Sequence, residues 1–155
     1  MASPNSEGAD LSLQTLNPRI SRHAFDWYVD MTDIANGDLL TAWVPGCNGR
    51  LLGLDMYMNK PVTTALKLAT VSMRINAVTV TGGVLSLTSA LCTPKGVRVA
   101  GSPVTAGFTF GPTDTIGLVA SAVTAFIEGS GKLVITWAND DLRTVAALAM
   151  IVPAT

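Results

Sequence analysis

The stretch LKLATVSMRINAVTV, residues 66–80, decides the fold class, because its apolar and polar side chains alternate. Every second position is apolar: Ala69, Val71, Met73, Ile75 and Ala77. The positions between them are mostly polar: Leu68, Thr70, Ser72, Arg74 and Asn76. Successive side chains of a β-strand point to opposite faces, so this strict period of two predicts a strand with one buried face. A helix would instead repeat apolar residues three and four positions apart.

Short apolar segments separated by turn signals continue in both directions from this stretch. We expect strands at LLTAWVP (39–45), RLLGLDMYMN (50–59), VLSLTSALC (84–92), VRVAG (97–101), KLVITWA (132–138) and TVAALAMIV (144–152). The segment IGLVASAVTAFIEG (116–129) allows a short helix, but its β-branched and aromatic residues favour an extended conformation. The spacing of these segments, about eight or nine strands in all, predicts an all-β sandwich or barrel.

The N-terminal part differs in charge from the rest, so we predict an N-terminal arm at 1–37 and a β-sandwich domain at 38–155. Residues 1–38 carry two basic and six acidic side chains, whereas residues 39–155 carry eight basic and five acidic ones. Within the arm, residues 23–30 alternate in strand fashion, with His23, Phe25, Trp27 and Val29 on one face. Two interpretations stay open: a first strand packed on the domain's own core, or an arm that docks on a partner.

Composition limits the partners. Charged residues make up 14% of the chain, against about 25% in an average soluble domain. A surface this poor in charge favours contact with other protein surfaces, so we expect an oligomer or a part of an assembly. The net charge of −1 argues against nucleic acid. The longest apolar run, at 145–152, is too short to cross a bilayer, and the polar start is not a secretory signal, so no membrane partner is expected.

The stretch FIEGSGKLVITWA (126–138) contains a Gly-Ser-Gly-Lys run like that of a phosphate-binding loop, but it does not match the sequence pattern of such a loop. Such a loop needs a glycine five positions before Gly131, where Phe126 stands, and a hydroxyl residue after Lys132, where Leu133 stands. The single histidine, His23, makes a Ser-His-Asp arrangement improbable. Cys47 and Cys92 form no C-x-x-C pair. A disulfide between them stays open, although buried thiols are the favoured interpretation.

The remaining chemical candidates have simpler explanations. Glu128 and Asp114 could serve a glycosidase, but no pattern pairs them. The acidic residues Asp26, Asp30, Asp33 and Asp38 lack the ligand spacing of a calcium loop, and a solvated face explains them better. Trp43, Trp137 and Tyr57 could form an aromatic platform, although core packing is the commoner role. We therefore expect no enzyme, cofactor, metal or small-molecule substrate, and a structural or interaction protein.

Four stretches together resemble a known class: DMTDIANGDLLTAWVP (30–45), GRLLGLDMYMN (49–59), GSGKLVITWAND (129–140) and VAALAMIVPAT (145–155). The order of these segments and their residue composition resemble those of small virion proteins of tailed bacteriophages, the capsid decoration or cement proteins. The resemblance implies an all-β fold, a jelly-roll-like antiparallel β-sandwich of about eight strands with an extended N-terminal arm. It also implies a homotrimer that is assembled in the host cytoplasm and located in the virion. It would bind the outer surface of the major capsid protein lattice and stabilise it.

On this resemblance the arm is the expected contact with the capsid. Arg19 and Arg22 would pair with capsid carboxylates, and Phe25, Trp27 and Tyr28 would be the anchors. The alternative is a phage tail or fibre component, or another carbohydrate- or receptor-binding β-sandwich, which would stack exposed Trp or Tyr on sugars.

Overall fold

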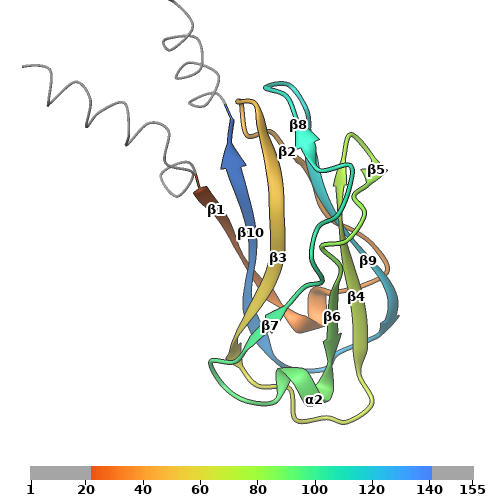
Figure 1. The fold of residues 1–155 in the computed structure, drawn as a ribbon. Coiled ribbons are helices and arrows are strands. Elements are labelled where there is room, and N and C mark those ends of the chain that lie inside the picture. Colours follow the sequence, from red (N-terminus) through yellow and green to blue (C-terminus); the bar gives the residue numbers. More distant parts are fainter. Residues whose placement is uncertain (1–21, 141–155) are drawn as a thin grey trace, which may run out of the picture.

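The computed structural model describes residues 22–140. The predicted strand at 144–152 and the predicted contact residue Arg19 lie outside these residues. Two antiparallel sheets pack face to face (Figure 1). Sheet A contains β1 (Arg22–Asp30), β10 (Ser130–Asn139), β3 (Gly49–Lys60), β7 (Arg98–Ala100) and β8 (Thr109–Phe110). Sheet B contains β2 (Gly37–Trp43), β9 (Ile116–Thr124), β4 (Leu68–Ile75), β5 (Val78–Thr79) and β6 (Leu85–Thr88). The helical turns are η1 (Met31–Asp33) and α2 (Ser89–Cys92).

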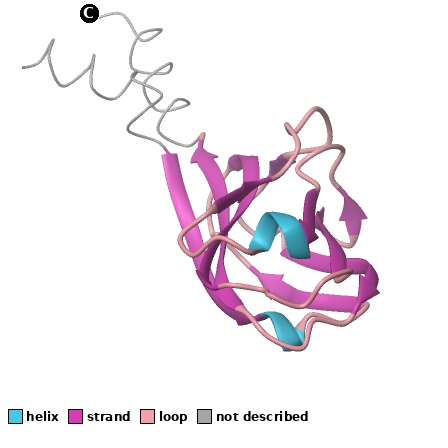
Figure 2. Ribbon diagram, turned by 90° about the horizontal axis from the view of Figure 1, so that it is seen from below, coloured by secondary structure: helices cyan, strands magenta, loops and turns pink. Residues whose placement is uncertain are grey.

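The strand order is that of a jelly roll. Without the two-residue strands β5 and β8, eight strands remain, in the orders β1-β10-β3-β7 and β2-β9-β4-β6. Successive strands of the chain mostly alternate between the two sheets, which is how a jelly roll wraps two four-stranded sheets around one core. Figure 2 looks onto the end of the sandwich that carries α2, with the strands in two layers behind it. The predicted fold class is confirmed.

The core lies between the sheets and follows the alternation of the sequence. In β4, Ala69, Val71, Met73 and Ile75 are buried, and the residues between them are partly exposed. In β10, Leu133 and Ile135 face the core, and the segment 116–124 is extended, as expected. Because both sheets turn one apolar face inward, burial of these side chains is the main stabilising contribution to the fold.

Two expected strands are interrupted. The stretch 66–80 is not one strand, because β4 ends at Ile75 and pairs back with β5 through Ile75–Val78. Asn76 and Ala77 form the two-residue turn with φ of 49° and 66°, the positive values that a type I′ hairpin requires. Ala77 is therefore exposed in a turn, not buried on the predicted apolar face. An apolar-polar alternation that continues through such a turn cannot reveal it.

The second interruption lies in the segment 84–92, which is β6 followed by the single turn α2. The Leu91 N–H donates to Thr88 Oγ1 at 3.3 Å. A threonine hydroxyl at this position caps a helix and ends the preceding strand. The strand prediction holds only as far as Thr88.

Part of the predicted arm belongs to the sandwich. β1 pairs antiparallel with β10 along its whole length, from Arg22–Ala138 to Asp30–Ser130. Residues 31–37 continue through η1 into β2, and Met31 and Ile34 are fully buried. The described part of segment 1–37 is thus integrated into the fold, and the predicted boundary at 37/38 separates β1 and η1 from the core on which they pack. Cross-strand pairing over more than a hundred residues leaves no local trace in the sequence.

Candidate partner-binding face

The predicted contact residues of β1 divide between its two faces. Phe25 and Trp27 are half-buried and pack against the core, and Val29 is buried. Arg22 and Tyr28 point to the other side, where Tyr28 is 66% exposed. The alternation expected for this segment is confirmed, and it favours packing on the domain's own core for the inward residues. Of the three predicted aromatic anchors, Tyr28 alone lies on the surface.

The inward aromatic rings join the two sheets. Phe25 stacks on Trp43 of β2 with ring centroids 4.4 Å apart, and His23 stacks on Trp137 of β10 at 4.5 Å. Trp137 meets Trp43 edge-on at 6.0 Å. Such ring pairs add to the stabilisation from burial. His23, Trp43 and Trp137 therefore have a packing role, and the two tryptophans are not the exposed platform that was considered.

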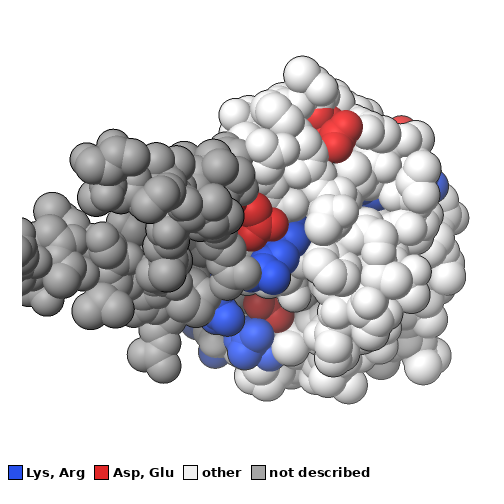
Figure 3. All heavy atoms as spheres, turned by 45° about the horizontal axis from the view of Figure 1, so that its top comes forward, with Lys and Arg blue, Asp and Glu red and all other residues white. Residues whose placement is uncertain are grey.

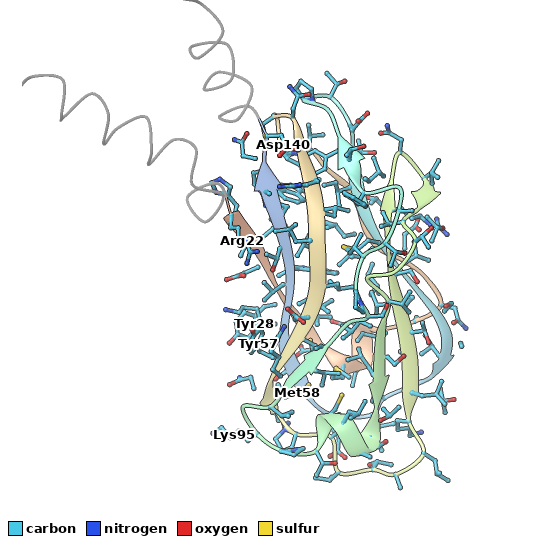
Figure 4. The ribbon with its side chains drawn as sticks, viewed as in Figure 1. Arg22, Tyr28, Tyr57, Met58, Lys95 and Asp140 are labelled. Atoms are coloured by element: carbon cyan, nitrogen blue, oxygen red, sulfur yellow. The ribbon has the colours of Figure 1, made fainter. Side chains whose placement is uncertain are left out.

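The outward residues of β1 continue into a row that crosses sheet A. The register places Tyr28 opposite Lys132, Lys132 opposite Tyr57, and Tyr57 opposite Arg98. Residues directly opposite in an antiparallel pair share a face of the sheet. Tyr57 is 40% exposed, and Figure 4 shows Arg22, Tyr28 and Tyr57 on the side of sheet A that faces away from sheet B.

Ion pairs hold the charged side chains of this row in place. Lys132 Nζ lies 3.2 Å from Asp26 Oδ2, and Arg98 Nη2 lies 3.1 Å from Asp55 Oδ1. The hydrogen bond and charge of Asp55 raise the pKa of Arg98 above its ordinary value. Pairs of this kind on a surface add little stability, but they fix where the polar groups stand. We call this surface the tyrosine face, defined by Arg22, Asp26, Tyr28, Asp55, Tyr57, Arg98 and Lys132.

A shallow groove of about 380 Å³ runs beside the row. Its lining includes Arg22, Gly53, Arg98 and Thr136. A side chain at Gly53 would meet no other atom within 4 Å, so the glycine leaves the floor of the groove open. Asp55 also lines the groove and pairs with Arg98, so the groove offers a partner protein both polar groups and the guanidinium of Arg22.

The outward side of sheet B is different in chemistry. The outward positions of its central strands β4 and β9 include Thr70, Ser72, Arg74, Val119 and Ser121. Arg74 approaches Asp38 of β2 at 3.6 Å, and the other residues named are uncharged. In the view of Figure 3, most of the charged atoms lie together beside the undescribed segments, and the rest of that surface is largely uncharged. Among the described strands, those of sheet B carry two charged residues, Asp38 and Arg74.

The structure does not bring the candidate carboxylates together. Glu128 contacts Thr63 and Thr64 before β4, whereas Asp114 accepts from the Gly111 N–H and from Asn76 Nδ2 beyond the end of β4. The eight residues of β4 separate these ends by about 26 Å, at about 3.3 Å per residue. Glycoside hydrolysis needs two carboxyl groups within about 10 Å. The Gly111 and Asn76 hydrogen bonds lower the pKa of Asp114, which is a loop-bracing role.

Other reactive groups have structural positions. Both cysteines are thiols, and burial raises the pKa of Cys92 to about 11, so its nucleophilic thiolate is scarce near neutral pH. Among residues 22–140, no three His, Cys, Asp or Glu side chains converge as metal ligands. The described part of the chain also has no helix long and apolar enough to cross a membrane.

Glu128 connects two loops by hydrogen bonds, and its replacement should change how the stability of the fold depends on pH. Four donors, the N–H and hydroxyl groups of Thr63 and Thr64, reach its Oε1 at 2.6–2.8 Å. These hydrogen bonds, that of the Thr63 hydroxyl first, lower the pKa of Glu128 to about 2 from 4.5. The carboxylate therefore stabilises the fold fully above pH 4.5 and loses this effect as pH falls toward 2.

For Glu128→Gln we expect a lower thermal unfolding midpoint at pH 7 and a difference from wild type that shrinks toward pH 2. Thermal unfolding followed by circular dichroism between pH 2 and 7 measures this. Asp30→Asn is the matched control, because the Asp30 side chain makes no capping hydrogen bond at η1. A difference that is constant across this pH range would contradict the assigned role.

No protein-family model matches the chain, and no curated protein sequence matches it at a significant level. The fold and the face themselves define the class: a jelly-roll β-sandwich with charged residues and tyrosines on one sheet.

Sequence reasoning found Arg22 and Tyr28 of this face but not Asp55, Tyr57 and Arg98 as their neighbours. One available signal was the alternation in β3, where Leu54, Met56 and Met58 are buried and Asp55 and Tyr57 point outward. The pairing of β3 with β10, and of β10 with β1, is what brings these residues together.

Proposed function

We propose that this protein is a structural virion protein, a capsid decoration or cement protein that binds the outer surface of the major capsid protein lattice as a homotrimer. The observation that carries the proposal is the tyrosine face. Exposed tyrosines beside an arginine are typical of protein-protein contacts, where aromatic residues and arginine dominate the binding energy. The nearly uncharged outer side of sheet B leaves a separate surface for contact between copies.

The position of the chain ends supports the same proposal. Arg22 begins β1 and pairs with Ala138, close to the end of β10, so the segments 1–21 and 141–155 continue from one corner of the sandwich (Figure 1). This corner borders the tyrosine face, since Arg22 belongs to it. Contacts by an N-terminal segment and by the folded face would act together, and linked contacts strengthen each other through high effective concentration.

We expect Tyr28→Ala combined with Tyr57→Ala to weaken binding to shells of the proposed partner, the major capsid protein, at least tenfold. Two exposed anchors lose their contact area, and neither side chain supports the core. Co-sedimentation with purified shells measures the occupancy. Val78→Ala is the control, because Val78 is 71% exposed on sheet B. Occupancy unchanged in the double variant would overturn the assignment of this face.

Truncation tests the N-terminal segment if it stops before Arg22. Removal of residues 2–21 leaves β1 intact, whereas removal of 1–30 would also take away Phe25, Trp27 and Val29 and expose the core. Lower occupancy of the capsid shells by the variant that lacks residues 2–21 would support a role of this segment in capsid binding, and unchanged occupancy would contradict it.

Carbohydrate or receptor binding, as in a tail or fibre component, is the second candidate. The exposed Tyr28 and Tyr57 favour it, since aromatic side chains stack on sugar rings. A glycan array separates the two functions: glycan binding that depends on these tyrosines, without shell binding, would select the second.

A further inference from the structure

The end of the sandwich that carries α2 exposes several large apolar side chains. Leu66 is 88% exposed, Ile127 64%, Leu91 48% and Leu68 40%. A shallow hollow of about 430 Å³ lies between the loop before β4 and the start of α2, lined by Leu66, Lys67, Leu68, Thr88, Ser89 and Ala90. We call these lining residues the apolar hollow. Contiguous exposed apolar surface is a common feature of interaction sites, and Leu66 and Leu68 both line this hollow.

Leu66 is held in an unfavourable conformation at this hollow. Its φ of 63° is in the left-handed region, which leucine rarely adopts. Hydrogen bonds on both sides keep it there: Thr64 N–H to Glu128 Oε1 at 2.6 Å, Lys67 N–H to Ser89 Oγ at 2.8 Å, and Ser89 Oγ to the Thr64 carbonyl at 2.7 Å. Strain at an exposed apolar residue has no benefit for the folded domain alone, so it points to a preorganised anchor.

The chain itself contains a segment that matches the hollow in chemistry. Residues 144–152, TVAALAMIV, have eight apolar residues out of nine, and no charged residue occurs in 144–155. Because the hollow is lined mainly by aliphatic groups, a short uncharged aliphatic segment fits it better than a charged peptide would.

Geometry favours the segment of a second copy. The hollow lies at the end of the sandwich where β10 begins, since Glu128 joins the loop before Leu66, and the chain leaves β10 at its other end. An extended chain needs about ten residues to run back along the ten residues of β10. This return uses 140–149, so of the segment 144–152 only Met150, Ile151 and Val152 would remain for the hollow. A neighbouring copy can place the whole segment there.

We propose that the apolar hollow binds residues 144–152 of a second copy of this chain, with Leu66 as the central anchor. The contact is head-to-tail, because it joins unlike ends of two molecules. Contacts of this type build rings when the rotation closes. Leu68 points to the outer side of sheet B, so the hollow is continuous with the nearly uncharged surface there. The proposal concerns contact between copies and does not depend on capsid binding.

Disulfide trapping tests the contact in the purified full-length protein. In a Cys47→Ser background, one chain carries Leu66→Cys and another carries Leu148→Cys, in the middle of the segment. After mixing and mild oxidation we expect a covalent dimer between the two variants. The mixture of Val78→Cys with Leu148→Cys is the control. Val78 is also highly exposed, and it pairs with Ile75 at the end of β4 opposite to Leu68, so this mixture should give at least tenfold less dimer.

The other outcomes overturn the proposal. A third variant carries both Leu66→Cys and Leu148→Cys in one chain. If it forms only an intramolecular disulfide, the chain's own segment fills the hollow. Equal dimer yields from the Leu66 and Val78 mixtures, or none from either, would show that the segment does not dock there.

An independent measurement uses the strain at Leu66. Leu66→Gly removes the anchor and also permits the positive φ, so the variant should associate at least tenfold more weakly by sedimentation equilibrium while its isolated subunit unfolds at a higher temperature. Loss of association through misfolding would instead lower that temperature, and unchanged association would overturn the role of Leu66.

Discussion

Replacing Ile135 by alanine should lower the free energy of unfolding by about 2–5 kcal/mol. Ile135 is 1% exposed and lies in the middle of β10, the strand between β1 and β3. Its register partners are Phe25 and Leu54, so the lost side chain leaves a cavity between rigid neighbours on both sides. Urea unfolding followed by tryptophan fluorescence measures the change.

The matched control on the same strand is Lys132→Ala. Lys132 points outward and forms an ion pair with Asp26, and such exposed pairs contribute less than about 1 kcal/mol. Similar losses for Ile135→Ala and Lys132→Ala would contradict the assignment of the two faces of β10.

Replacing Gly82 by alanine should cost about 2–4 kcal/mol, because strain and steric overlap act together. Gly82 has φ of 82°, and a Cβ atom there would overlap the carbonyl oxygen of Pro103. The overlapping atom belongs to the backbone of a neighbouring loop and cannot rotate away as a side chain would. Thermal and urea unfolding of the variant give the loss.

Two other glycines separate the contributions. Gly107 has φ of 67° but open space around it, so Gly107→Ala should show the conformational strain alone, about 1–2 kcal/mol. Gly53 has neither constraint, and Gly53→Ala should leave stability unchanged or slightly higher. The loss of stability should be largest for Gly82→Ala, smaller for Gly107→Ala and smallest for Gly53→Ala. Any other order of these losses would contradict the backbone conformations at the three glycines.

Local pattern was sufficient for much of the fold. The alternation in β4 and β1 correctly separated inward from outward residues, because a strand imposes its period of two on any sequence that must bury one face. The same pattern could not locate the turn at Asn76 and Ala77, since a two-residue hairpin keeps the alternation running. It also could not show that β1 pairs with β10, because hydrogen bonding between distant strands involves the backbone, which every residue shares.

The sequence by itself determined that the fold is all-β and which side of β1 and of β4 is buried, because side-chain alternation is local. The tertiary structure alone decided the candidate sites. Tyr28, Tyr57 and Arg98 form one face because register joins three strands that are far apart in the chain. Leu66 is held exposed because Glu128, from the loop before β10, and Ser89, from α2, form hydrogen bonds with its neighbours. Both depend on contacts between distant segments, and such contacts exist only once the two sheets have packed.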